Sequence, residues 1–117
     1  MYDDVTSVAL HSALRSLAAR QRTIADNVAN IETPGFQAGR VAFEDALRAA
    51  VARGDGAGAA AVAPTYAQSL SPTREDGNNV DLDQETLSNI ETGLRYKIVS
   101  QAVDHRFGLL RAVLRGS

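Results

Sequence analysis

The sequence has no cysteine and no tryptophan, and only 5% of its 117 residues are aromatic. Without cysteine the chain can form no disulfide framework, no thiolate zinc site and no thiol nucleophile. Aromatic side chains bury the most surface per residue, so a core of this chain has to be built from leucine, isoleucine, valine and alanine, and we expect it to be thin. The length predicts one domain rather than two.

An excess of basic charge is also missing. The formal net charge is −2, and no run of lysine or arginine occurs, so we expect no nucleic-acid partner. No apolar stretch approaches the roughly 20 residues of a membrane-spanning helix. The chain starts with acidic residues at positions 3 and 4, where a secretory signal peptide would be basic. We therefore expect any export to occur without a cleaved signal.

A regular apolar pattern predicts a long helix over residues 4–31. Large apolar residues recur there at alternating intervals of three and four, which is typical of the seam of a coiled coil. After the helix, Pro34 and Gly35 suit the second and third positions of a type II turn. The seam residues that we expect to pair with another helix of the same chain are Leu10, Leu14, Leu17, Ile24 and Val28.

A second long helix is predicted from residue 82 to about residue 114, with Asp81 as its cap. At about 100° per residue, its apolar side chains form two stripes on nearly opposite faces. We expect one stripe to pair with the first helix within the chain: Leu87, Ile90, Leu94 and Ile98. We expect the other stripe to pack against neighbouring subunits: Val99, Val103, Leu110 and Leu114.

The middle of the chain has weaker signals. Residues 41–53 predict a short helix that ends at Gly54. Residues 54–72 are rich in glycine, alanine, serine and proline, and we expect a flexible, irregular insertion there, with room for a brief extended piece at residues 62–70.

Together these patterns predict an all-α fold, in which two long terminal helices pair as a coiled-coil hairpin around a short middle helix and an irregular Gly/Ala-rich insertion. We treat residues 1–117 as a single domain. Its parts are an N-terminal helix and turn (1–36), a short helix and flexible insertion (37–80), and a C-terminal helix (81–117). A hairpin of two narrow helices leaves apolar surface exposed, which usually marks an interaction site.

Residues that could carry chemistry are scarce. The two histidines, His11 and His105, are far apart in sequence and have no second metal ligand within one helical turn. The segment 76–83 is rich in oxygen ligands, but it departs from the calcium-loop pattern at Val80 and Asp81. We therefore expect no catalytic residue, no cofactor site and no metal site.

Two polar motifs are more informative. We expect the two asparagines of the first motif to bond the last carbonyls of the first helix and the amides of the turn. We expect the paired asparagines of the second to bond backbone groups that a turn leaves open. The first motif comprises Asn27, Asn30, Thr33, Pro34, Gly35 and Phe36, and the second comprises Asp76, Gly77, Asn78, Asn79, Val80 and Asp81.

These motifs resemble the flagellar basal-body rod and hook proteins. An apolar heptad helix, Asn27-Val-Ala-Asn30 and Thr33-Pro-Gly-Phe36 match the amino-terminal signature of that family, and the second motif with Leu94-Arg-Tyr96 is similar to its proximal rod members. The resemblance implies a structural subunit of the periplasmic proximal rod. Such subunits assemble with copies of themselves and with other rod proteins, contact the rod-to-ring junction protein and the flagellar export gate, and bind no small-molecule substrate.

One alternative from another class stays open. A stand-alone helical adaptor or export chaperone could use the two-striped carboxyl-terminal helix to hold a partner helix. A rod subunit differs from an adaptor in stoichiometry, because it co-purifies with a large membrane-anchored complex. An enzyme ranks third, because no set of acid, base and nucleophile is present.

Overall fold

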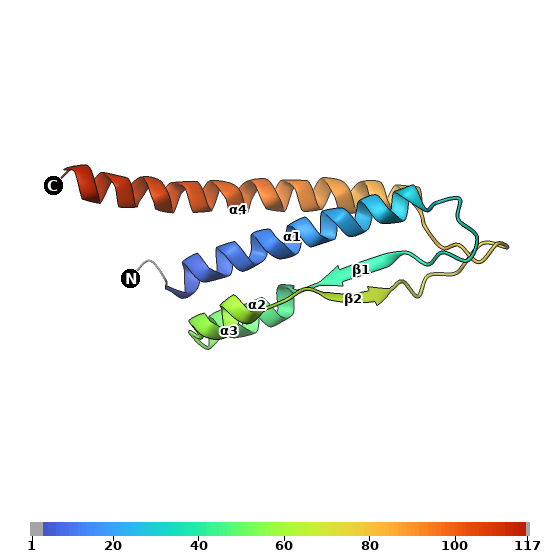
Figure 1. Ribbon diagram of the computed structural model, residues 1–117, viewed down its shortest axis with the longest axis horizontal. Helices are drawn as coiled ribbons and strands as arrows, with labels where there is room; N and C mark the ends of the chain where they lie inside the picture. Colours follow the sequence, from blue (N-terminus) through green and yellow to red (C-terminus); the bar gives the residue numbers. More distant parts are fainter. Residues whose placement is uncertain (1–3, 117) are drawn as a thin grey trace.

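The computed structural model describes residues 4–116, which form an elongated molecule of 66 × 26 × 15 Å (Figure 1). The middle layer is the first helix, with the last helix on one side and a two-stranded antiparallel sheet plus two short helices on the other. In chain order the elements are α1 (Val5–Ala29), β1 (Gly39–Ala42), α2 (Glu44–Ala52), α3 (Gly56–Ala61), β2 (Thr65–Gln68) and α4 (Leu82–Gly116).

Helix α1 starts and ends within two residues of its predicted bounds. The Asp4 carboxylate accepts a hydrogen bond from the Ser7 N–H at 2.8 Å, which caps the helix. After α1, the Phe36 N–H donates to the Thr33 carbonyl at 3.2 Å, and Gly35 has a φ of +77°. A positive φ at the third position is what a type II turn requires, so the predicted turn is confirmed.

The middle of the chain is more regular than predicted, and the all-α description is only approximate. Part of the Gly/Ala-rich insertion forms α3, and β2 pairs antiparallel with β1, with Gly39 opposite Gln68 and Ala42 opposite Thr65. The short helix α2 begins at Glu44 because the residues before it belong to β1. Strand β2 lies within the extended piece expected at residues 62–70, but its pairing with β1 was not predicted, because pairing depends on a distant partner strand more than on local propensity.

Helix α3 forms because its neighbours supply what its small residues lack. The Asp55 side chain caps it by accepting from the Gly58 N–H at 2.8 Å. Ala59 is fully buried against α1, where the Ser12 hydroxyl donates to the Ala59 carbonyl at 2.6 Å. Small side chains let the two backbones come close enough for this hydrogen bond.

Strand β1 also lies very close to α1. A Cβ atom at Gly39 would lie 2.9 Å from the Thr23 Cγ2 atom, so only glycine permits this approach without a shift. The core between these elements is small, and polar side chains are buried almost as often as apolar ones. Buried apolar residues are Leu17, Ala19, Ile24, Ala38, Val41, Phe43, Ala50, Ala59 and Val80.

The predicted seam of α1 is partly buried. Leu17 and Ile24 are buried and Leu10 and Leu14 are half-buried, whereas Val28 is 40% exposed. Helix α4 runs antiparallel to α1, and its far half is tied to the start of α1. There the Arg106 guanidinium bonds the Asp4 carboxylate at 2.6 Å.

Helix α4, however, turns the opposite face to α1 from the one predicted. The stripe expected to pair within the chain is exposed: Leu87, Ile90, Leu94 and Ile98 are 56–63% accessible. Of the stripe expected to face neighbours, Val103 and Leu110 instead line a cavity against α1, Val99 is half-buried, and Leu114 is 75% exposed. The cause is Glu85, which is fully buried on the inner face; Leu87 then lies about 200° further round the helix.

A three-helix ion cluster centres on Glu44 at the start of α2. Arg20 of α1 bonds both Glu44 oxygens, at 2.6 and 2.7 Å, and Arg95 of α4 bonds one of them at 3.0 Å. The Arg20 guanidinium also lies 5.1 Å from the centre of the Phe43 ring. The Arg20 hydrogen bonds outweigh the effect of burial and lower the pKa of Glu44 to about 2.

This cluster predicts a pH-dependent contribution to stability. Because the folded-state pKa of Glu44 lies below its ordinary value of 4.5, its contribution is present above pH 4.5 and is lost as the pH falls toward 2. We expect Glu44→Gln to lower the free energy of unfolding by about 1–2 kcal/mol at pH 7, allowing for partial solvent screening. The difference from wild type should shrink at pH 3. Urea unfolding followed by circular dichroism measures both.

The control is Asp45→Asn. Asp45 is adjacent, but its side chain is almost fully exposed, and this variant should match wild type within about 0.5 kcal/mol. An equal loss in Glu44→Gln at pH 7 and pH 3 would contradict the assignment.

Candidate functional site

The two motifs meet at one end of the molecule, where the chain leaves α1 and later enters α4 (Figure 1). Asn78 is fully buried there. Its amide donates to the backbone carbonyls of Asn30 at 2.8 Å and Thr33 at 2.9 Å, and its side-chain oxygen accepts from the Val80 N–H at 2.8 Å. The second motif therefore holds the turn of the first, which confirms the expected role of Asn78.

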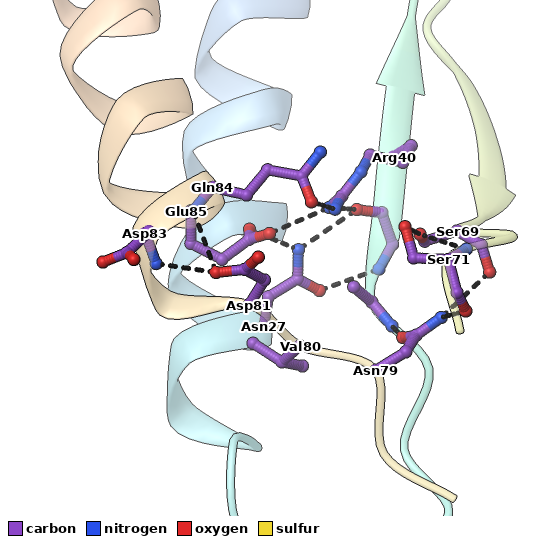
Figure 2. A network of polar contacts seen from close by, with 12 residues as sticks. Asn27, Arg40, Ser69, Ser71, Asn79, Val80, Asp81, Asp83, Gln84 and Glu85 are labelled. Atoms are coloured by element: carbon purple, nitrogen blue, oxygen red, sulfur yellow. Dashed lines mark hydrogen bonds and ion pairs between the residues drawn. The ribbon is translucent and has the colours of Figure 1, made fainter. Parts of the chain in front are cut away.

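Asn79 joins three separate segments at the same junction (Figure 2). Its side-chain oxygen accepts from the Ala38 N–H at 2.7 Å, just before β1. Its amide donates to the carbonyls of Ser69 and Ser71, both at 3.1 Å, just after β2. Asn79 thus fixes the start of β1 and the end of β2 against the start of α4, again by backbone contacts as predicted.

The two glycine turns of the motifs lie back to back. The Gly35 N–H donates to the Asp76 carbonyl at 2.7 Å. Gly77 has a φ of +85°, and a Cβ atom there would lie 3.2 Å from the Gly35 Cα atom. Arg74, between the hairpin and the second motif, braces the contact by donating to the carbonyls of Val80 and Ile31. Both turns are therefore fixed by their contact, and not only by local sequence.

Asn27 departs from its predicted role. We expected it to bond the last carbonyls of α1, as Asn30 does through the Asp26 carbonyl at 2.8 Å. Instead Asn27 is buried and points toward β1 and α4 (Figure 2). It accepts from the Gly39 N–H at 2.8 Å and donates to the Gly39 carbonyl at 3.1 Å and to a Glu85 oxygen at 2.7 Å.

Glu85 completes a polar cluster that the sequence analysis missed. Its second carboxylate oxygen accepts from Arg40 of β1 at 3.0 Å, and Arg40 also bonds the Gln84 side chain at 3.1 Å. Both oxygens of this buried charge are thus partnered, which burial requires. We call Asn27, Arg40, Gln84 and Glu85 the Glu85 cluster. No local pattern separates Glu85 from the exposed acidic residues beside it, because its partners Asn27 and Arg40 lie on other elements.

Asp81 starts α4 as predicted. Its carboxylate accepts from the N–H groups of Asp83 at 3.0 Å and Gln84 at 3.3 Å. The other motif residues have simpler positions. Phe36 is half-buried and Pro34 is exposed.

The junction is built to hold backbone segments together. The side chains of Asn27, Asn78 and Asn79 form their hydrogen bonds with other parts of the same chain. Within residues 4–116, no cluster of three or more acidic or histidine side chains could hold a metal ion. None of the helices in this range combines the length and apolar character needed to cross a membrane.

Comparison with known proteins relates the chain to flagellar components. A family model described as "Flagella basal body rod protein" matches residues 9–37, which include the first motif up to Phe36. Relatives named "Flagellar basal body rod protein FlgB" match over nearly the whole chain. The protein of Borrelia hermsii is 32% identical over 90% of this chain and 92% of its own length. The Escherichia coli protein is 30% identical over 90% of this chain and 90% of its own length. The Bacillus subtilis protein is 26% identical over 92% of this chain and 91% of its own length.

The Glu85 cluster predicts a large effect of Asn27→Ala. The substitution leaves the Gly39 N–H and one Glu85 oxygen without their partner, whereas the Gly39 carbonyl keeps its bond from Arg40 at 2.9 Å. We therefore expect a loss of about 2–4 kcal/mol in the free energy of unfolding. Asn30→Ala is the matched control, because its backbone carbonyl still accepts from Asn78, and it should lose less than about 1 kcal/mol. Urea denaturation compares the two. Equal losses would show that the buried amide has no special role.

The contact between the turns predicts opposite effects of two glycine substitutions. Gly77→Ala forces a side chain into a left-handed conformation and against Gly35, and should destabilise by about 1–3 kcal/mol. Gly93→Ala lies within α4, where a Cβ atom has no neighbour within 4 Å, and should stabilise by up to about 1 kcal/mol. Thermal unfolding of both variants is the measurement, and a neutral Gly77→Ala would contradict the close contact between the two turns.

Proposed function

The chain belongs to the FlgB family of flagellar basal body rod proteins and is a structural subunit of the flagellar rod, and we propose a position and a mechanical role for it within the rod. In this proposal residues 1–117 act as one rod-type domain in the proximal part of the rod. The subunit assembles with other basal-body rod components, including copies of itself. Its role is mechanical rather than catalytic.

The observation that supports this proposal best is the exposed outer stripe of α4. Helix α4 has 35 residues and is about 52 Å long. Four large aliphatic side chains of its outer stripe are exposed to solvent. A chain that works alone would be expected to cover such a stripe. A subunit of a repeated assembly covers it with its neighbours.

The junction gives the subunit the stiffness that a drive shaft needs. Torque can pass from α1 to α4 only if the angle between them is held under load. Asn78 bonds two carbonyls of the turn after α1, and Asn79 bonds backbone groups beside β1 and β2, so a change of this angle would break several hydrogen bonds together. The first and second motifs therefore serve as the rigid end of the subunit.

Finer features of the proposal rest on the resemblance to rod proteins. They are a periplasmic position, contacts with the rod-to-ring junction protein and the flagellar export gate, and export without signal cleavage. None of these three features depends on how β1 pairs with β2.

The proposal predicts that the chain is found in basal bodies. In cells of the source organism, an epitope-tagged copy that replaces the native gene should co-purify with detergent-resistant basal bodies. Deletion should abolish motility and leave no complete rod in electron micrographs, and re-expression should restore both. Recovery of the tagged chain only in a small cytosolic complex with a helical partner would instead support the adaptor.

A further inference from the structure

The outer stripe of α4 includes a short apolar ridge. Leu87, Ile90 and Leu94 are 58%, 63% and 58% exposed and follow one another at intervals of three and four. They span about 10 Å along the helix. We call these three residues the α4 ridge.

A groove of matching length lies elsewhere on the molecule. It runs between the first half of α1 and α2, from Thr6 to Ala13, again about 10 Å along a helix. Its volume is about 350 Å³. Alanines on α1 leave room for a neighbouring helix to come close, and apolar residues of both helices form the sides. The residues that define this α1–α2 groove are Ala9, Leu10, Ala13, Leu47 and Val51.

One chain cannot place its own ridge in its own groove. Helix α1 lies between α4 and α2 (Figure 1), and among residues 4–116 only the long Arg95 side chain of α4 reaches across to Glu44. The ridge is exposed, on a face of α4 that does not contact α1. The two surfaces can therefore meet only between two chains. A contact between two different surfaces is head-to-tail, so it repeats along an assembly instead of closing as a two-fold dimer.

Charges beside the two surfaces are complementary. Glu91, beside the ridge, is exposed and has no ion pair among residues 4–116. Among residues 4–116, Arg48, which lines the groove, pairs only with Asp45 of its own helix, whose carboxylate is almost fully exposed. The other charged residue of the groove lining, Glu44, is already paired with two arginines of its own chain. Docking of the ridge could bring Glu91 of one copy toward Arg48 of the next.

We propose that the α4 ridge of one copy docks in the α1–α2 groove of the next copy, with Glu91 and Arg48 facing each other across the contact. This inference rests on the proposed function, because only a subunit of a repeated assembly needs an open, head-to-tail contact. It adds the two surfaces and identifies the occupant of the groove as a second copy of this chain.

Cysteine cross-linking tests the contact. Because the chain has no native cysteine, only the introduced thiols of this chain can take part in a cross-link between its copies. The variant Leu47→Cys/Leu94→Cys places one thiol in the groove and one on the ridge. Basal bodies isolated from cells that express this full-length variant are oxidised with copper phenanthroline and analysed by non-reducing electrophoresis with an immunoblot. We expect a ladder of dimers and higher multimers of this chain, which reducing agent removes.

Matched variants define the control. Each single cysteine variant should stay monomeric, and Leu47→Cys/Leu109→Cys should give no ladder, since Leu109 is an equally exposed leucine of α4 outside the ridge. Dimers from Leu94→Cys alone would overturn the proposal in favour of a symmetric ridge-to-ridge contact. A cross-link to a different rod protein, or none in basal bodies that contain the double variant, would also overturn it.

A charge exchange keeps the proposal testable if the cysteine variants are not incorporated. Arg48→Glu should reduce incorporation into basal bodies at least fivefold, and adding Glu91→Arg in the same chain should restore it. Failure of this rescue overturns the ridge-and-groove contact. Absence of the wild-type chain from basal bodies would be a different result, since it would overturn the proposed function itself.

Discussion

The buried carboxylate of Glu85 is the constraint on which the rest of the structure depends. A charge without solvent contact is tolerated only when its oxygens are partnered, and the partners come from α1 through Asn27 and from β1 through Arg40. These bonds fix the rotation of α4 about its axis. The rotation in turn decides which apolar stripe contacts α1 and which remains for another molecule.

The junction shows how a thin core is compensated. The chain has few large buried side chains, and several buried residues are polar. Buried amides at Asn27, Asn78 and Asn79 each connect segments that are distant in sequence. Hydrogen bonds of this kind are directional, so they specify one arrangement of the segments more strictly than a small apolar core could. For a rod subunit this favours a fixed shape.

The three-helix ion cluster around Glu44 also fixes the arrangement of the helices, near the middle of α1. Arginines from α1 and α4 converge on one carboxylate of α2, so the three layers are joined at a second place, away from the junction. With the Asp4–Arg106 pair near the far end, α1 is held at several points along its length. The outer face of α4, by contrast, leaves Leu87, Ile90 and Leu94 exposed, and this is the face that we propose for assembly.

The sequence alone determined the two long helices, the cap of the second, the glycine turns and the two motifs, because these depend on neighbours a few residues away. Spacing of apolar residues, a capping aspartate at Asp81 and a glycine with positive φ at Gly35 are local signals. The motifs also carried the family resemblance. Of the candidate site, the backbone-binding roles of Asn78 and Asn79 could be anticipated, since turns leave polar groups open.

Only the tertiary structure decided the rotation of α4 and the pairing of β1 with β2. Both stripes of α4 were apolar enough to face α1, and the choice came from Glu85, whose partners lie on other elements. Likewise, the sequence left room for a brief extended piece within residues 62–70, but only β1 supplied the partner that makes it a paired strand, and α1 supplied the hydrogen bond that holds α3. Interactions between segments far apart in the chain outweighed local propensity at both places, and a single sequence does not record which distant groups will meet.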